Sequence, residues 1–130
     1  MSDRILYVDD EPALVFLITR ALEKLGIAAQ GFASAQEALA AFVREPQAFS
    51  LVLTDLTMPG GMSGLELAQA VLAIRPDTAV VIASGCIDSE ETRRAAAVGV
   101  RTVIQKPGKV AEMAQLVSGL LRDLRPGPTP

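Results

Sequence analysis

Residues 51–67 read LVLTDLTMPGGMSGLEL and contain the unit from which the rest of the chain is built. The stretch opens with an apolar run without polar alternation, which is typical of a strand covered on both faces in a parallel sheet. That run ends in Thr54-Asp55 and is followed by a Met-Pro-Gly-Gly turn. Ser63 and Glu66 then have the spacing of a capping box, which begins a helix. The stretch therefore predicts a buried strand, a turn and a helix.

The same strand-helix unit recurs along the whole chain. Short apolar runs occupy residues 5–8, 27–32, 51–54, 79–83 and 102–105. Segments with helical periodicity lie between them, the first starting at Pro12 and stopping at Gly26. Five such units predict an α/β fold, a (βα)5 doubly wound five-stranded parallel sheet. The run at 27–32 is the weakest, so we expect it at an edge.

Length and composition favour one domain and exclude several chemistries. The 130 residues are 50% hydrophobic and 21% charged, enough for one compact core. We expect this domain to span residues 1–125, with 126–130 as a Pro-rich tail or a truncated linker. The sequence has no histidine, which excludes imidazole catalysis, a histidine-ligated metal and a phosphoryl group stored on a histidine of these residues.

Charge and cysteine content limit the expected partners and compartment. With 12 basic and 15 acidic residues the net charge is -3, which gives no electrostatic footprint for nucleic acid. Cys86 is the single cysteine, and the apolar runs are shorter than the roughly 20 residues of a membrane helix. We therefore expect a cytoplasmic monomer or weak homodimer that by itself binds neither nucleic acid nor membrane.

Polar residues follow four of the predicted strands where each strand ends. They are Asp9, Asp10, Asp55, Ser84 and Lys106. Parallel strands bring these ends to one edge of the sheet, where ligands of such folds bind. Three close carboxylates repel one another unless a cation joins them, and Mg²⁺ prefers such oxygen ligands. One aspartate can then act as a nucleophile on phosphorus, while the lysine and the serine hold the phosphoryl oxygens.

Each of these residues also has a simpler interpretation. The sequence Asp-Asp-Glu-Pro after a strand is suited to capping the next helix. Asp55 before Met-Pro-Gly-Gly is suited to forming a turn, and a lone Ser84 or Lys106 is more often solvated than functional. These readings do not explain one candidate at each of four strand ends, so their joint occurrence favours a site.

The motifs VDDEP, LTDLTMPGGMSGLEL, VVIASG and QKPG occur in an order and spacing that resemble the receiver domain of response regulators, the CheY-like domain of two-component signalling. The resemblance covers about residues 3–124 and implies the flavodoxin-like strand order 2-1-3-4-5. It implies a signalling domain, not an enzyme, that accepts a phosphoryl group on Asp55 from a partner histidine kinase or phosphotransfer protein. The residues within these motifs also resemble those of receiver domains in hybrid sensor kinases.

The resemblance implies a role for each residue of the metal site. Asp10 and Asp55 would bind Mg²⁺ directly, together with the backbone carbonyl of Thr57, and Asp9 would act largely through water. Because the chain has no histidine, the donor histidine must lie outside these 130 residues.

The resemblance also implies how the phosphoryl group is read. Lys106 would contact it, aimed by Pro107, which the family often holds in a cis peptide, and Ser84 would be the switch hydroxyl. One position departs from the family: Val103 stands where an aromatic switch residue is usual, and no aromatic follows residue 49. Coupling through a ring that swings inward is therefore in doubt here.

Two other functions remain open. A Mg²⁺-dependent phosphatase or mutase resembling the haloacid-dehalogenase enzymes also forms an aspartyl phosphate, but it usually carries a second aspartate where this chain has Thr57. A degenerate receiver that acts as a protein-binding scaffold is the second alternative, although all five acceptor-site residues are present. A flavin- or nucleotide-binding module is disfavoured, because the first strand-helix turn offers VDDEP instead of glycines.

Overall fold

The computed structural model describes residues 4–56, 58, 61–85, 88–100 and 102–124. Five strands alternate with five α-helices and one short 3₁₀ helix. In chain order the elements are β1 (Arg4–Val8), α1 (Pro12–Lys24), β2 (Ala29–Phe32), α2 (Ala35–Arg44), η1 (Pro46–Ala48), β3 (Phe49–Asp55), α3 (Gly64–Ile74), β4 (Ala79–Ser84), α4 (Ser89–Ala97), β5 (Thr102–Gln105) and α5 (Val110–Leu124).

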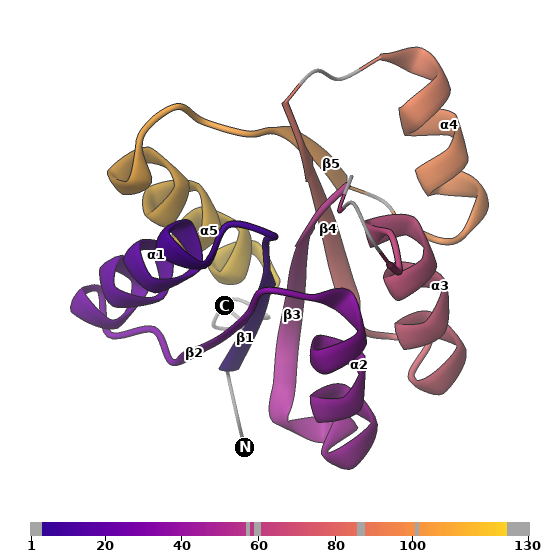
Figure 1. The fold of residues 1–130 in the computed structure, drawn as a ribbon, viewed down its shortest axis with the longest axis horizontal. Helices are drawn as coiled ribbons and strands as arrows, with labels where there is room; N and C mark the ends of the chain where they lie inside the picture. Colours follow the sequence, from indigo (N-terminus) through magenta and orange to yellow (C-terminus); the bar gives the residue numbers. More distant parts are fainter. Residues whose placement is uncertain (1–3, 57, 59–60, 86–87, 101, 125–130) are drawn as a thin grey trace, which may run out of the picture.

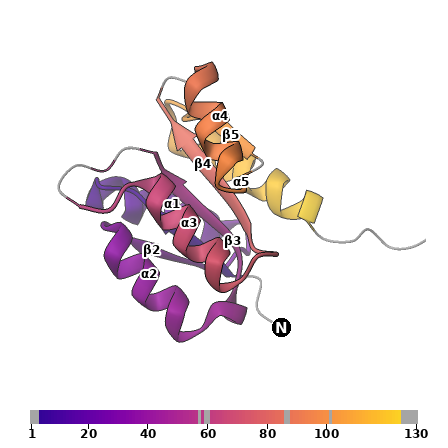
Figure 2. The same cartoon turned by 90° about the vertical axis from the view of Figure 1, so that its right-hand side faces the viewer.

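The five strands form one parallel sheet in the order β2-β1-β3-β4-β5. Helices α1 and α5 cover one face, and α2, α3 and α4 lie on the other, as Figures 1 and 2 show. The predicted doubly wound fold and its strand order are confirmed, and β2 lies at an edge as its weak apolar run indicates.

Alternate residues of the three central strands, β1, β3 and β4, are buried in two separate cores. Leu6 and Val8 of β1 join the α2–α3 core, the cluster that the sheet forms with α2 and α3. Ile5 and Tyr7 point the other way, into the α1–α5 core formed with α1 and α5. Because a strand turns successive side chains to opposite faces, covering both faces requires a continuous apolar run.

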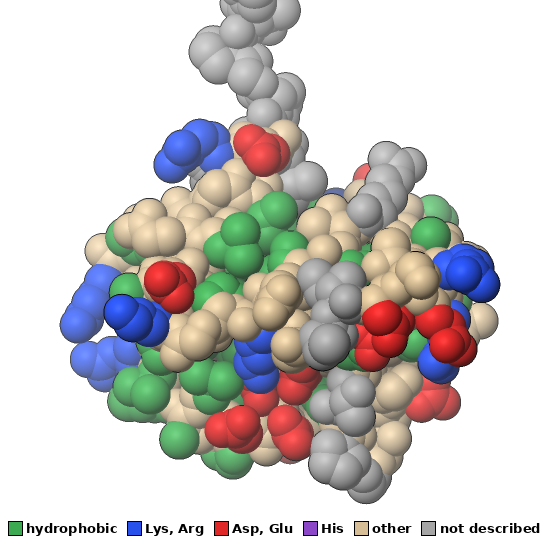
Figure 3. Space-filling view, turned by 90° about the horizontal axis from the view of Figure 1, so that it is seen from above, with side chains coloured by type: hydrophobic (Ala, Val, Ile, Leu, Met, Phe, Trp, Pro, Cys, Tyr) green, Lys and Arg blue, Asp and Glu red, His purple; other side chains and the backbone are tan. Residues whose placement is uncertain are grey.

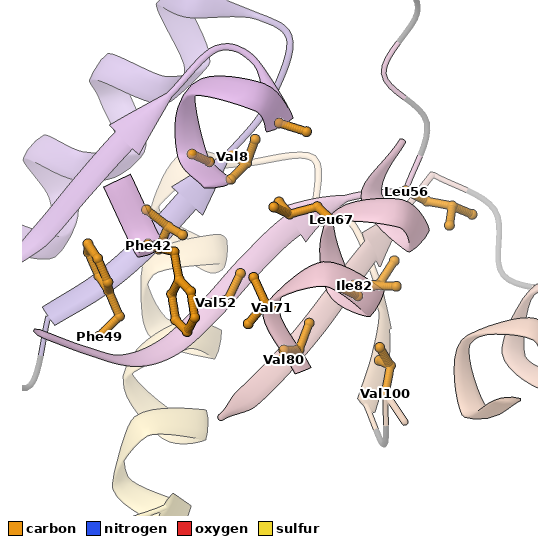
Figure 4. Packing of buried hydrophobic residues seen from close by; sticks show 14 of the residues in the cluster. Val8, Phe42, Phe49, Val52, Leu56, Leu67, Val71, Val80, Ile82 and Val100 are labelled. Atoms are coloured by element: carbon orange, nitrogen blue, oxygen red, sulfur yellow. The ribbon is translucent and has the colours of Figure 1, made fainter. Parts of the chain in front are cut away.

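The α2–α3 core is dense beneath the strand that carries Asp55. Figure 4 shows Phe42 of α2 and Leu67 of α3 close to Val52 of β3. All three side chains are completely buried. The strand is therefore held from this face along its length, which fixes the position of its carboxyl end.

Helix ends follow the predicted signals with one difference. α1 has Pro12 in its first turn, and Gly26 after it has a φ of +80°, a left-handed conformation that favours glycine. The capping box at Ser63 is complete. Ser34 and Glu37 have the same capping-box spacing, and the Ser34 side chain accepts from the backbone N–H of Glu37, but its hydroxyl also donates to Oε1 of that residue.

Two strands start two residues away from their predicted starts, and the other strand boundaries differ by at most one residue. β3 starts at Phe49, before the predicted run, because this buried residue pairs with Arg4 of β1. β2 starts only at Ala29, and the two preceding apolar residues stay outside the strand. In the part of the chain that the structure describes, no helix combines the length and apolarity needed to span a bilayer.

Candidate functional site

Strand register brings the predicted site residues to one edge of the sheet. Val8 at the end of β1 pairs with Thr54 of β3, and Ser84 at the end of β4 pairs with Gln105 at the end of β5. The residues that follow these strands therefore start side by side. Figure 3 shows this edge of the molecule from above, where acidic side chains gather next to a basic one.

Three carboxylates form the centre of this edge. Asp9, Asp10 and Asp55 each present an oxygen, and the three oxygens all lie within 4.8 Å of one another. Asp9 is only 1% exposed, so its charge needs compensation from its neighbours. An all-oxygen set of this charge and spacing fits a hard divalent cation, and it fits softer transition metals less well.

Lys106 reaches the carboxylates from the end of β5. Its Nζ lies 2.6 Å from Oδ2 of Asp9 and 3.5 Å from Oδ2 of Asp55. Its backbone N–H donates to the carbonyl oxygen of Ser84 at 2.7 Å, which continues the β4–β5 ladder by one residue. None of the described peptide bonds is cis, so the bond before Pro107 is trans, in contrast to the form common in the family. The strand ladder therefore places the lysine here without a cis bond.

Asp9 is the most firmly held of the three carboxylates. The hydroxyl of Tyr7 donates to its Oδ2 at 3.0 Å, and the backbone N–H of Glu11 donates to its Oδ1 at 3.0 Å. Our sequence reading missed Tyr7 as a site residue, although the period of a strand places it on the same side as Asp9. With Lys106 also bonded, both carboxylate oxygens of Asp9 have protein partners, and the side chain is fixed in one orientation.

Burial and charge act against each other on the ionisable groups. Burial raises the pKa of Asp55 above its usual value of 3.8, Lys106 opposes this rise, and the charges of Asp9 and Asp10 add to it. For Lys106, burial works to lower the pKa, but the bond to Asp9 and the two aspartate charges outweigh it, so the pKa is raised. Burial and the adjacent Asp9 also raise the pKa of Tyr7. The site therefore keeps its cation charged while making it costly to ionise Asp55.

The chain returns tightly from Asp55 to α3. A Cβ added at Gly64 would collide with the carbonyl oxygen of Asp55, so no larger residue fits at the start of α3 without a backbone shift. The N–H of Gly64 donates to the carbonyl of Leu56 at 3.0 Å, and the hydroxyl of Thr54 donates to the carbonyl of Asp55 at 3.0 Å. These contacts fix the backbone on both sides of the candidate acceptor.

Ser84 lies at the end of β4 and is 6% exposed. Its hydroxyl donates to Oε1 of Glu91 in the first turn of α4, at 3.1 Å. In the sequence, Asp88 and Glu91 have the spacing of a helix cap, and the backbone N–H of Glu91 does donate to Oδ1 of Asp88 at 2.7 Å. The contact with Ser84 depends on how α4 turns back toward β4, and no local sequence signal reports it.

The structure thus brings Asp9, Asp10, Asp55 and Lys106 together and places Ser84 at the neighbouring strand end. Thr57, whose backbone carbonyl is a predicted metal ligand, and the predicted tail at 126–130 lie outside the described residues, as does Cys86. Val103, which replaces the usual aromatic, is partly buried against the α2–α3 core.

Comparison with known proteins agrees with this geometry. The chain is 32% identical over 111 residues to the C4-dicarboxylate transport transcriptional regulatory protein DctD of Rhizobium meliloti, an alignment that covers 85% of this chain and 24% of DctD. It is 37% identical over 82 residues to the response regulator receiver protein CpdR of Brucella abortus, covering 63% of this chain and 66% of CpdR. The chain therefore spans a quarter of the first relative and less than two thirds of the second.

A solved structure and a family profile give the same result over nearly the whole chain. The crystal structure of a CheY-like response regulator receiver domain protein from Methanospirillum hungatei superimposes with a TM-score of 0.81 at 27% identity, covering 95% of this chain and 97% of that one. The profile of the response regulator receiver domain matches residues 5–118. This match includes the acidic edge, which is formed by Asp9, Asp10, Asp55, Ser84 and Lys106. The chain belongs to the response regulator receiver family of two-component signalling.

Proposed function

We propose that Asp55 accepts a phosphoryl group from a phosphohistidine of a partner histidine kinase or phosphotransfer protein and that the chain relays the signal by a conformational change. The observation that carries this proposal is the meeting of three carboxylates with one lysine at the carboxyl edge of the sheet. The donor histidine lies outside these 130 residues, which contain none.

The transfer exchanges one bond to phosphorus for another. A carboxylate oxygen of Asp55 forms a bond to phosphorus while the bond from phosphorus to the donor imidazole nitrogen breaks. The imidazole leaves with the bonding electron pair and takes up a proton, so the product is an acyl phosphate on Asp55 and a neutral histidine. Because little covalent work falls to the protein, positioning and charge neutralisation account for most of the acceleration.

The residues around Asp55 supply this positioning. Lys106 Nζ, 3.5 Å from Oδ2 of Asp55, is placed to pair with an oxygen of the incoming phosphoryl group. The bond of this lysine to Asp9 holds it at the edge before the group arrives. Ser84, at the adjacent strand end, supplies a hydroxyl donor to a second phosphoryl oxygen.

The acidic edge is suited to Mg²⁺. Asp10 and Asp55 would hold the ion directly, with the backbone carbonyl of Thr57, and Asp9 would act through water. Bound Mg²⁺ would neutralise carboxylate and phosphoryl charge. The close spacing of the three carboxylates supports this assignment, because three negative charges repel one another. Within the described part of the chain, Lys106 is the only cation that contacts two of them, so a divalent cation would balance the remaining charge.

Labelling of Asp55 tests the proposal. Purified protein is incubated with acetyl phosphate and Mg²⁺ and examined by intact mass spectrometry. We expect the mass of one phosphoryl group to be added to wild type and to Asp123→Asn, an exposed aspartate of α5 that serves as the matched control. Asp55→Asn should remain unlabelled, and chelation of Mg²⁺ should suppress labelling of wild type.

Two outcomes would contradict the proposal. Equal labelling of Asp55→Asn and wild type would move the acceptor elsewhere. Multiple turnover of acetyl phosphate or of phosphomonoesters at enzyme-like rates, without accumulation of the labelled protein, would favour the phosphatase alternative.

A further inference from the structure

The hydroxyl of Ser84 has a partner that competes with a phosphoryl group. It donates to Oε1 of Glu91 at 3.1 Å, and an ionised carboxylate only accepts hydrogen bonds. A serine hydroxyl has a single proton to donate. Ser84 therefore cannot donate to Glu91 and to a phosphoryl oxygen on Asp55 at the same time.

Glu91 belongs to the helix that is packed least firmly against the sheet. Among the nine residues of α4, all of them described, only Ala95 is buried. Figure 1 shows this helix standing beside β4 and β5 at one end of the molecule. The side-chain hydrogen bond from β4 to its first turn therefore adds a polar contact to this small apolar one.

The aromatic side chain that usually couples the phosphorylation site to this part of the family's fold is absent from the present chain. Val103 occupies the position of the aromatic switch residue, and the last aromatic in the sequence is Phe49. A direct hydrogen bond between Ser84 and the first turn of α4 couples the same two regions without a ring.

We propose that Glu91 is a positioning residue that competes with the phosphoryl group for the Ser84 hydroxyl, so that phosphorylation of Asp55 releases the first turn of α4. This inference rests on the proposed function and adds the route by which the signal leaves the site. Because coupling between two sites is reciprocal, the bond that holds α4 in the unphosphorylated chain must also weaken the binding of the phosphoryl group.

Removing Glu91 should therefore favour the activated state. Glu91 is only partly buried, so water competes for its carboxylate and weakens the bond, and we expect Glu91→Ala to tighten binding of a phosphoryl mimic about fivefold. Glu91→Gln keeps a neutral acceptor oxygen and should lie between Glu91→Ala and wild type.

The experiment is a titration of the whole chain with beryllofluoride in saturating Mg²⁺. Calorimetry measures the affinity, and backbone amide chemical shifts report which residues change on binding. The matched control is Glu90→Ala, which removes the same charge from the same turn at an exposed neighbouring position. We expect this control to change affinity less than twofold. In wild type, amide shifts on binding should extend from Ser84 through residues 88–92, and in Glu91→Ala that segment should already lie near its bound positions.

A double-mutant cycle separates coupling from a merely structural role. In a Ser84→Ala background, Glu91→Ala should no longer change beryllofluoride affinity, because the competing bond is already absent. Equal effects of Glu91→Ala and Glu90→Ala, or an undiminished effect of Glu91→Ala without Ser84, would overturn the inference while leaving the proposed function intact. Failure of wild type to bind beryllofluoride would instead overturn both.

Discussion

α3 and α4 both follow strands that end at the acidic edge, yet they are attached to the sheet in opposite ways. α3 buries Gly64, Leu67, Ala68 and Val71, and it begins with a complete capping box. α4 buries Ala95 alone, and polar contacts involving Asp88 and Glu91 secure its start. The helix after the proposed acceptor aspartate is part of the core, whereas the helix after the proposed switch serine buries one side chain and is joined to β4 by a side-chain hydrogen bond.

This difference assigns distinct roles to the two strand ends. Gly64 packs so closely against the carbonyl of Asp55 that an added Cβ would collide with it, and the start of α3 is therefore held next to the proposed acceptor. The link from Ser84 to α4 can break without exposing much apolar surface. Elements that move in signalling come from the less stable parts of a fold, so we expect α4 to be the more mobile of the two helices and α3 the more fixed.

The largest expected effect is the difference in stability between substitutions at the first residue of α3 and at the first residue of α4. Gly64→Ala places a Cβ against the backbone of Asp55, and we expect it to lower the free energy of unfolding by about 2–3 kcal/mol, as overpacking does. Ser89→Ala alters the equivalent position of α4, which is exposed, and should change stability by less than about 0.5 kcal/mol. Urea denaturation of both variants measures the contrast, and equal losses would contradict it.

Mg²⁺ binding should stabilise β1 and β3, which carry the carboxylates, and should not stabilise α4. At ten times its Kd, Mg²⁺ should add about 1.4 kcal/mol to the free energy of unfolding, as expected for a ligand that binds only the folded state. Asp10→Asn should remove most of this gain, and Asp123→Asn should retain it. Amide exchange should slow in β1 and β3 and remain unchanged in α4. Slower exchange confined to α4 would show that the ion binds elsewhere.

Ionisation of Asp55, which lies next to the start of α3, should lower the free energy of unfolding at neutral pH. Burial raises the pKa of Asp55 above 3.8, so its contribution to stability is fully present below that pH and is lost as the pH rises through the folded-state pKa. Because Lys106 offsets part of the burial, we expect a smaller effect than that of Mg²⁺.

Asp55→Asn tests this pH dependence, because the amide stays neutral throughout. The variant should be more stable than wild type at pH 7, and the advantage should disappear as the pH falls below 3.8. Glu90→Gln on α4 removes the same single charge away from the site and serves as the control. Urea unfolding at a series of pH values provides the measurement, and an advantage for the variant that grew toward low pH would reverse the assigned sign.

Local sequence patterns were enough to predict the strand ends of the firmly packed region. The apolar runs of β1 and β3, and the capping box at Ser63, are local patterns, and they placed Asp9 and Asp55 at strand ends before any contact was known. Parallel register then brought these ends together, which follows from topology alone.

The contacts that escaped prediction depend on side-chain direction across different elements. Tyr7 reads as one more core residue of an apolar run, and only the folded chain shows its hydroxyl against Asp9. Glu91 reads as a capping residue, and its bond to Ser84 requires knowing how α4 returns to β4. Short polar links of this kind leave no periodic trace in a sequence.

The smallest expected effect tests whether the two helices unfold separately. Ser63→Ala removes the capping box of α3 and should cost about 1 kcal/mol of global stability, because α3 unfolds only with the core. Asp88→Ala removes the cap of α4 and should change global stability by less than about 0.5 kcal/mol, since that helix can fray alone. Its amides should nevertheless exchange faster in native-state hydrogen exchange, while those of α3 stay protected. If Asp88→Ala instead lowered protection across α3 and α4 together, the two helices would form one cooperative unit, and release of α4 by itself could not carry the signal.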